Sequence, residues 1–432
     1  PDSKPSPGWW PCNDYPAWLK RVSDAVHKSK KDARIVFNTY NWHYVNEAER
    51  REFLKNIPKD ITVQITFDIG KEQRREGFYC PVMDYSISAC EPGEYFKSES
   101  AIAHEMGLQI LSTANTAGAT WDFGTIPYVP VPQQWIRRFN SLDQARRDWN
   151  VDSYYDNHHY GWWPSVVTDL GRWAFWAPQL DLDEMLKKLA VRDFGAEAAD
   201  KVLEVWDLWS EAMQNDYVAT NEEQYGPLRV GPSYPLIFHP NITRVMAGKE
   251  IKFPTTPGAH FGSNIIKTMY QPYEVEHQSP GALRYPAELR CLRRLREKFA
   301  HGVEELEKLR AVVPERKLAK LEEQIRLGKY IVCNAATAAC VKEWYMLNIK
   351  LLGTSDVAEA NKILDQLEAL ALKEIANAES AVELVQADSR LGWEPSMEYV
   401  TDKWHIDWKI RQVKHMLQGD FQSYRDLLNM PL

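Results

Sequence analysis

The segment between residues 15 and 176 alternates apolar β-type runs with stretches of helical periodicity. The sequence predicts strands at 34–40, 61–67, 108–114 and 151–156, with helical patterns in the intervals between them. Strands separated by helices at this spacing form βαβ units, in which neighbouring strands run parallel. We therefore predict one parallel sheet in which these four strands are neighbours and their carboxyl ends share one edge.

Polar side chains follow each predicted strand. Asn38, Asp68, Asn115 and Asp156 lie at or just beyond the strand ends. In a (β/α)8 barrel the active site is built at this face. A doubly wound open sheet uses the same edge, usually with a glycine-rich phosphate-binding turn. Because the chain has no GxGxxG or GxxxxGKS/T motif, we predict an α/β fold of the (β/α)8 TIM-barrel type.

The number of strands is too small for a closed barrel. Four runs are clear, a fifth is conceivable at 82–88, and no strand precedes the first helix. Eight strands close such a barrel. The sequence thus resembles the C-terminal half, strands five to eight, and predicts a missing N-terminal half on upstream residues or on a separate chain. We expect apolar inner faces, as in "ITVQITF", and two edges that need such a companion.

The remaining sequence changes character after Pro178. We predict a barrel half at 1–178, a helical pair turning at Gly195 followed by a long aromatic loop region within 179–282, and a helical bundle at 283–432. The last part reads as helical throughout, giving an all-α domain after the barrel portion. Its apolar pattern is interrupted repeatedly, which favours a bundle over a free coiled coil.

The net charge and the spacing of the cysteines argue against several classes of protein for this chain. The net charge is −8, which argues against nucleic-acid binding, and no run of about 18 apolar residues would span a membrane. The six cysteines show no CxxC spacing and read as free thiols in a reducing compartment, so we expect a cytoplasmic protein. A disulfide between Cys80 and Cys90 is the alternative. Homo-oligomerisation is left open.

Aromatic and hydrogen-bonding side chains gather near the predicted strand ends. Indole faces stack on the C–H faces of pyranose rings, whereas an ordinary core would use aliphatic side chains. We therefore predict a carbohydrate-binding mouth. The candidate substrate-binding residues are Asn38, Trp42, Asn115, Trp121, His158, His159, Tyr160, Trp162 and Trp163.

Four acids at or near strand ends are the candidate catalytic residues. They are Asp68, Asp84, Asp122 and Asp156, of which Asp156 and Asp122 have the most aromatic and hydrogen-bonding neighbours. Glycoside cleavage commonly uses two carboxyl groups, one as acid and one as base or nucleophile. The alternative for each is structural, because an aspartate that closes a strand often caps the following helix or ties down a loop.

No metal or cofactor is expected. His158 and His159 are adjacent, so in an extended segment their side chains point to opposite faces, which argues against a shared metal. The chain has no HExxH motif, and no GxSxG motif supports an acyl-transfer enzyme.

The stretches "IVFNTYNW", "ITVQITFD", "STANTAGATWDFG", "HHYGWWPS" and "ADSRLGWEPSMEY" carry a resemblance. Their succession resembles a little-characterised group of bacterial glycoside-hydrolase-like proteins, similar in layout to the barrels of β-hexosaminidases and α-glucuronidases. The resemblance implies a principal catalytic acid after strand four, a position upstream of Pro1. It assigns no catalytic residue within this chain.

The function that these observations favour is an exo-acting glycosidase that uses paired carboxylates in an aromatic-lined pocket. The main alternative is a non-catalytic carbohydrate-binding or scaffold protein on the same fold. A sugar lyase or isomerase is a third reading, and it would often require a metal or a lysine base.

Overall fold

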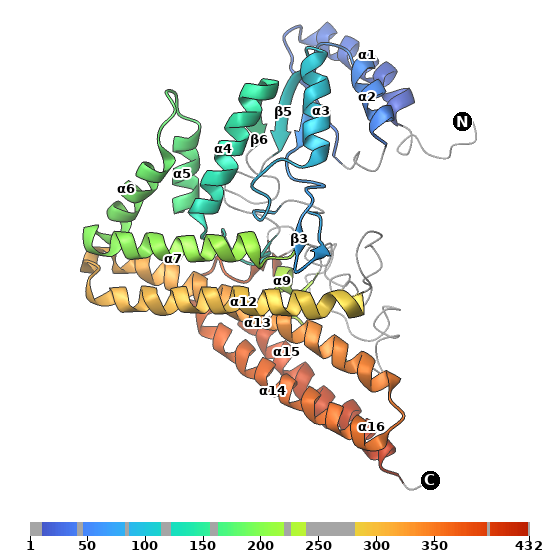
Figure 1. Ribbon diagram of the computed structural model, residues 1–432, viewed down its shortest axis with the longest axis vertical. Coiled ribbons are helices and arrows are strands. Elements are labelled where there is room, and N and C mark those ends of the chain that lie inside the picture. The colour runs from blue at the N-terminus through green and yellow to red at the C-terminus, as the bar shows by residue number, and fades with distance from the viewer. Residues whose placement is uncertain are drawn as a thin grey trace.

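The computed structural model describes residues 11–40, 46–82, 86–113, 122–155, 163–219, 226–238, 281–394 and 398–430. These residues form a mixed α/β unit followed by a long helical region (Figure 1). The arrowhead of β5 points toward the helical region, so the carboxyl ends of the parallel strands face the second half of the chain.

The predicted parallel sheet is confirmed. Its strands lie in the order β1-β2-β5-β6, and each neighbouring pair is parallel. The strands are β1 Ile35–Asn38, β2 Ile61–Thr66, β5 Gln109–Thr113 and β6 Val151–Tyr155. Within the described residues the sheet has four strands and two open edges, so a closed barrel is not seen.

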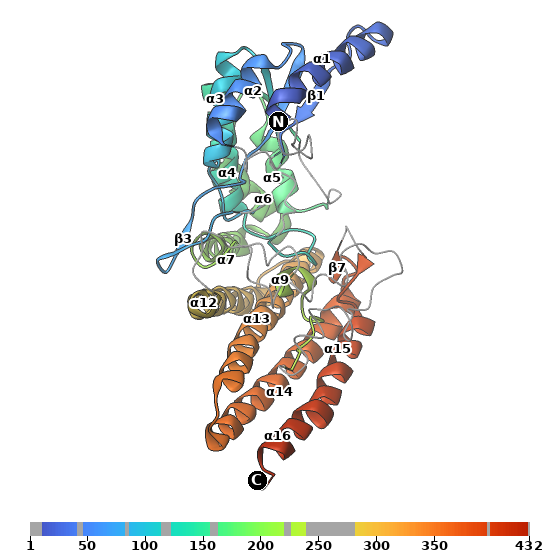
Figure 2. The same cartoon turned by 90° about the vertical axis from the view of Figure 1, so that its right-hand side faces the viewer.

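Helices cover one face of the sheet, as Figures 1 and 2 show. Asn46 caps α2 by accepting from the Glu49 amide at 2.9 Å, and Ser165 and Thr168 form a capping box at α5. The helices are α1 Pro11–Ser29, α2 Glu47–Asn56, α3 Glu94–Glu105, α4 Pro132–Trp149 and α5 Val166–Ala174.

The two faces of the sheet differ in chemistry. Ile61, Val63 and Ile65 are buried in the core that β2 shares with the helices, whereas Thr62 and Gln64 point to the other face. The expectation of a continuously apolar inner face is therefore wrong: "ITVQITF" alternates, and its polar positions form a hydrogen-bonded surface. Thr62, for example, donates to Oε1 of Gln109 at 3.2 Å.

The sheet is strongly curved. Nη2 of Arg34, just before β1, lies 2.7 Å from Oδ2 of Asp152 on β6, although these strands are the two edges of the sheet. Nε of Arg34 also donates to Oγ1 of Thr62 at 3.1 Å, which places this chain of contacts on the polar face. Side chains from opposite edges meet in this way because the polar face is concave.

The fifth strand expected at 82–88 is not formed by its described residues. Val82 is instead held by backbone hydrogen bonds with Gly70 and Lys71 at 2.8 and 3.0 Å, and residues 86–88 form a turn. A short antiparallel hairpin, β3 Arg74–Arg75 with β4 Phe78–Tyr79, precedes this stretch.

Long helices build the second half. The helical pair turns at Gly195 as predicted. The helices α12, α13 and α14 pack in sequence, and α15 packs on α14 (Figure 2). The elements are α6 Leu182–Phe194, α7 Ala196–Asn215, α9 Pro227–Val230, α12 Gly281–Lys308, α13 Leu318–Gly353, α14 Val357–Ala387, α15 Lys403–Met416 and α16 Gln422–Leu428.

The expectation that the last part is helical throughout is wrong at one place. A small antiparallel hairpin, β7 Trp393–Glu394 with β8 Glu398–Tyr399, interrupts the helices between α14 and α15. Strands of two residues carry no periodic signal, so the sequence pattern could not reveal them.

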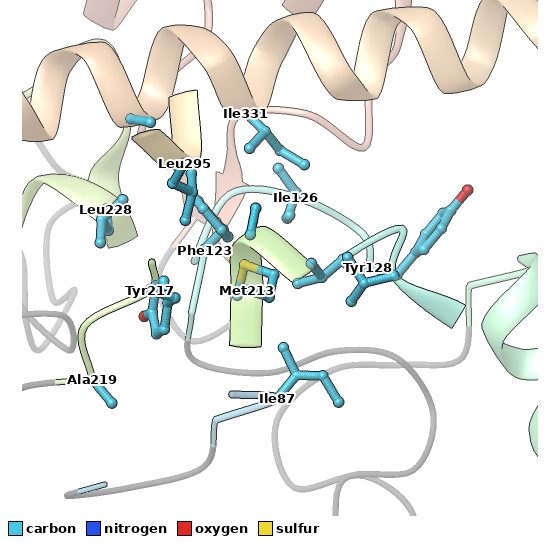
Figure 3. Close-up of a cluster of buried hydrophobic side chains, with 14 of the residues drawn as sticks. Ile87, Phe123, Ile126, Tyr128, Met213, Tyr217, Ala219, Leu228, Leu295 and Ile331 are labelled. Carbon is cyan, nitrogen blue, oxygen red and sulfur yellow. The ribbon is translucent and has the colours of Figure 1, made fainter. Parts of the chain in front are cut away.

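One hydrophobic core joins the sheet unit to the helical region. Figure 3 shows Phe123 and Ile126, from the loop beyond β5, packed beside Met213 of α7, Leu295 of α12 and Ile331 of α13. All five side chains are buried. The carboxyl edge of the sheet is thus covered by side chains from the helical region.

The described cysteines are free thiols, as the sequence predicted. The Cys90 thiol lies 3.3 Å from the carbonyl oxygen of Gln134 and forms no disulfide, so the alternative Cys80–Cys90 bridge is absent. Among the described helices, none combines the length and the apolarity that crossing a bilayer needs.

Candidate active site

The structure describes four of the residues predicted for the site: Asp68, Asp122, Asn38 and Trp163. It brings the two aspartates together at the carboxyl end of the sheet and leaves Asn38 and Trp163 outside this pair. The other predicted site residues lie outside the described residues: Trp42, Asp84, Asn115, Trp121, Asp156, His158, His159, Tyr160 and Trp162.

Asp68 follows β2 and is completely buried. Its Oδ2 accepts from the Ser86 amide at 2.9 Å and from Nη2 of Arg138 at 3.1 Å, while Oδ1 has no hydrogen-bond partner among the described residues. Burial raises the pKa of the Asp68 carboxyl, because a low-dielectric interior disfavours the charged form, and the positive charge of Arg138 opposes this only in part.

Asp122 is also completely buried, and it binds the same turn. Its Oδ1 accepts from the Ser86 hydroxyl at 2.6 Å, and its Oδ2 accepts from the Ile87 amide at 2.9 Å. Ser86 therefore connects the two carboxylates, one through its amide and the other through its hydroxyl. Neither carboxylate faces solvent, which matches the loop-tying alternative considered for both residues.

Arg138 on α4 completes this network, and sequence reasoning missed it. Its Nη1 donates to the carbonyl oxygens of Ser86 and Ala89 at 3.0 and 2.9 Å, and its guanidinium lies 5.0 Å from the centre of the Phe67 ring. The signal was present, because Arg138 falls on the apolar face that Trp135 and Leu142 define in α4. A charge on the buried side of a helix indicates a buried partner.

Asn38 and Trp163 occupy different surroundings. Oδ1 of Asn38, at the exposed end of β1, accepts from the Tyr40 amide at 2.9 Å and so supports the turn that follows.

The Trp163 ring is half-buried and meets the ring of Trp393 edge to face, with centroids 6.3 Å apart and planes at 84°. Trp393 belongs to the β7–β8 hairpin of the helical region, which no sequence pattern placed beside the sheet unit.

A second buried ion pair lies beside the loop that carries Asp122. Nη2 of Arg229 is 2.7 Å from Oε1 of Glu394, and both side chains are buried. The backbone of Gly124 packs directly on Arg229, since a Cβ at this position would collide with that side chain. Arg229 thus contacts both the loop that carries Asp122 and the β7–β8 hairpin that carries Glu394. The sequence analysis singled out neither Arg229 nor Glu394.

The described residues contain no group of three or more histidine, cysteine, aspartate or glutamate side chains placed to hold a metal ion. The chemical resources of this part of the site are therefore carboxylates, hydroxyl groups, guanidinium groups and aromatic rings.

Comparisons with known proteins include a distant likeness to a solved structure. No family model matches the chain, and no curated protein matches it. Among solved structures, the chain is similar to a GH138 enzyme targeting pectin rhamnogalacturonan II, with a TM-score of 0.48 and 12% sequence identity. The alignment covers 91% of this chain and 56% of that structure, so the chain spans little more than half of its length.

Proposed function

We propose that this protein is a glycoside hydrolase whose active site lies at the carboxyl end of the parallel sheet. The observation that carries the proposal is the buried network of Asp68, Arg138, Ser86 and Asp122. It fixes the backbone from Ser86, two residues after Asp84 in the sequence, at the carboxyl end of the sheet, where α/β sheets place their ligands.

In this proposal the buried acids are positioning residues, and Asp84 and Asp156 are the catalytic candidates. One carboxyl group donates a proton to the glycosidic oxygen, and the other activates water or attacks the anomeric carbon. A companion segment that adds strands to the sheet would contribute at least one further carboxylate.

Exo-action is supported by the closure of this edge of the sheet. Thr125, three residues beyond Asp122, accepts from the Tyr330 hydroxyl at 2.8 Å and, through its carbonyl oxygen, from the Gly392 amide at 3.0 Å. Contacts of this kind bring the helical region across the strand ends, which favours a pocket for a chain terminus over an open groove.

The test is hydrolysis of a panel of nitrophenyl glycosides and unlabelled oligosaccharides by the complete natural protein. Asp84→Asn and Asp156→Asn should each lower kcat by at least ~10²-fold without lowering the melting temperature, in the range of losing a general acid or base. Asp68→Asn should mainly lower the melting temperature. Full activity in both Asp84→Asn and Asp156→Asn would refute the assignment of the carboxylates, and a protein that hydrolyses no glycoside would refute the function.

A non-catalytic carbohydrate-binding protein is the second candidate. It is favoured by the complete burial of Asp68 and Asp122, which leaves neither described carboxylate able to touch a substrate. Binding of an oligosaccharide without turnover, unchanged in Asp84→Asn and Asp156→Asn, would decide for this alternative.

A further inference from the structure

Two tryptophans from opposite halves of the chain meet beyond the sheet. Trp163 lies just before α5, and Trp393 begins the β7–β8 hairpin of the helical region. Their rings stand nearly perpendicular, at 84°, with centroids 6.3 Å apart, and both side chains are only half-buried. The pair therefore presents a right-angled aromatic corner with ring surface open to solvent.

These two tryptophans differ from three tryptophans of the core, although a further core tryptophan, Trp135, also shows no indole partner among the described residues. Trp206, Trp209 and Trp344 are completely buried, and each indole N–H donates to a protein acceptor, at 3.1, 3.3 and 2.9 Å respectively. At Trp163 and Trp393, no indole hydrogen bond is found with any part of the chain that the structure describes. Buried indoles normally satisfy their N–H group, whereas a partly exposed one keeps it for water or a ligand.

The Trp393 side of the corner is rigidly supported. Gly392 has φ +79°, a conformation that favours glycine, and a Cβ there would collide with the carbonyl oxygen of Thr401. On the other side of Trp393, the buried carboxylate of Glu394 is ion-paired with Arg229. The indole is thus fixed by a backbone constraint and by an ion pair, which is the pre-organisation that a binding wall requires.

We propose that Trp163 and Trp393 form a saccharide-binding corner, in which one indole face stacks on a pyranose ring and the indole N–H groups donate to its hydroxyl groups. This inference rests on the proposed function and deepens it, because the helical region would then supply half of a subsite. The carboxylate next to Trp393 in the sequence, Glu394, is ion-paired with Arg229, and the occupant that we propose for the corner is an uncharged pyranose.

The experiment uses the full chain, an array of neutral and uronic-acid-containing oligosaccharides, and titration calorimetry on the strongest binder. Trp393→Ala should weaken binding by at least ~10-fold, as expected when a stacking face and a donor are lost together, and Trp393→Phe should retain part of the affinity. The control is Trp404→Ala on α15, whose side chain is 56% exposed and lies outside the corner; its affinity should be unchanged.

The outcomes separate a binding role from a structural one, and the subsite from the hydrolase. Unchanged affinity for the oligosaccharide in both Trp393→Ala and Trp393→Phe overturns the proposed binding corner. If Trp393→Ala then only lowers the melting temperature, the role of Trp393 is structural. Failure of the wild-type chain to bind any oligosaccharide also overturns it, as does a preference for uronic acids that Trp393→Ala leaves intact. Binding that depends on Trp393 without any hydrolysis supports the corner and refutes only the proposed hydrolase.

Discussion

Nη2 of Arg138 lies 3.1 Å from Oδ2 of Asp68, and neither side chain has any exposed surface. Removal of one partner leaves an uncompensated charge in the interior, which typically costs about 3–5 kcal/mol. Arg138 also holds the carbonyl oxygens of Ser86 and Ala89. Arg138 therefore holds the strand-end turn together with Asp68 and Asp122.

We expect Arg138→Met to lower the free energy of unfolding by about 3–5 kcal/mol, because Asp68 and two backbone carbonyl groups lose their donor. Chemical denaturation monitored by circular dichroism measures this change. The matched control is Arg137→Met, since Arg137 is exposed on the same helix; its effect should stay within about 0.5 kcal/mol. Equal effects of the two variants would show that the buried network contributes little.

A pH effect is expected from Glu99 on α3. Burial raises its pKa to about 7, against the opposing charge of Arg50 at 3.1 Å. A raised carboxyl pKa means that the folded state holds the proton more tightly than the unfolded state does. The stabilisation is therefore complete below the ordinary value of 4.5 and is lost as pH rises to about 7.

Accordingly, the free energy of unfolding should fall between pH 4.5 and 7 by up to about 3 kcal/mol from this group. Glu99→Gln should remove this part of the slope, as measured by urea denaturation across the window. Glu94→Gln serves as the control, because Glu94 is largely exposed on the same helix. A slope that persists in Glu99→Gln would contradict the prediction.

Gly392→Ala should destabilise the hairpin. The substitution places a Cβ against the carbonyl oxygen of Thr401 and forces an L-residue to adopt φ +79°, which together should cost at least about 2 kcal/mol. Differential scanning calorimetry measures the loss. Gly353→Ala, at the end of α13, is the control, because a Cβ there meets nothing within 4 Å. If the two variants melt alike, the hairpin is not under this constraint.

The open edge at β1 gives a prediction about a companion strand. The Thr39 amide donates to the carbonyl oxygen of Gln64 at 3.0 Å, so in the alternating parallel pattern the amides of Val36 and Asn38 point away from β2. In residues 1–432 alone these two amides should exchange hydrogen at least ~10²-fold faster than the amides of β2.

A companion segment that pairs with β1, as we propose, should slow this exchange. Hydrogen exchange followed by mass spectrometry with residue-level fragmentation resolves the two strands. Slow exchange at Val36 and Asn38 in the isolated chain would show that the β1 edge is already covered and needs no companion.

Local signals made much of the sheet unit predictable. The parallel order follows from the alternation of elements, and Asn46, Ser165 and Gly195 mark helix ends through short-range chemistry that the structure confirms. The face of β2 was misread because Thr62 and Gln64 were taken as part of an apolar run, although their alternation with isoleucine and valine was visible.

The long-range parts of the candidate site could not be read in the same way. The contact between Asp68 and Arg138 joins residues from different βα units, and the hairpin that carries Trp393 reaches the sheet unit from the far half of the sequence. Nothing local distinguishes an aspartate that faces a pocket from one that is buried in a hydrogen-bond network. That distinction depends on which distant donor meets the carboxylate.

The shared core of Figure 3 limits where this polypeptide can be truncated without exposing apolar surface. Phe123 and Ile126 are covered by residues of α7, α12 and α13, so truncation after α5 would expose these apolar side chains to solvent at the strand ends. The sheet unit and the long helices should therefore melt in a single cooperative transition.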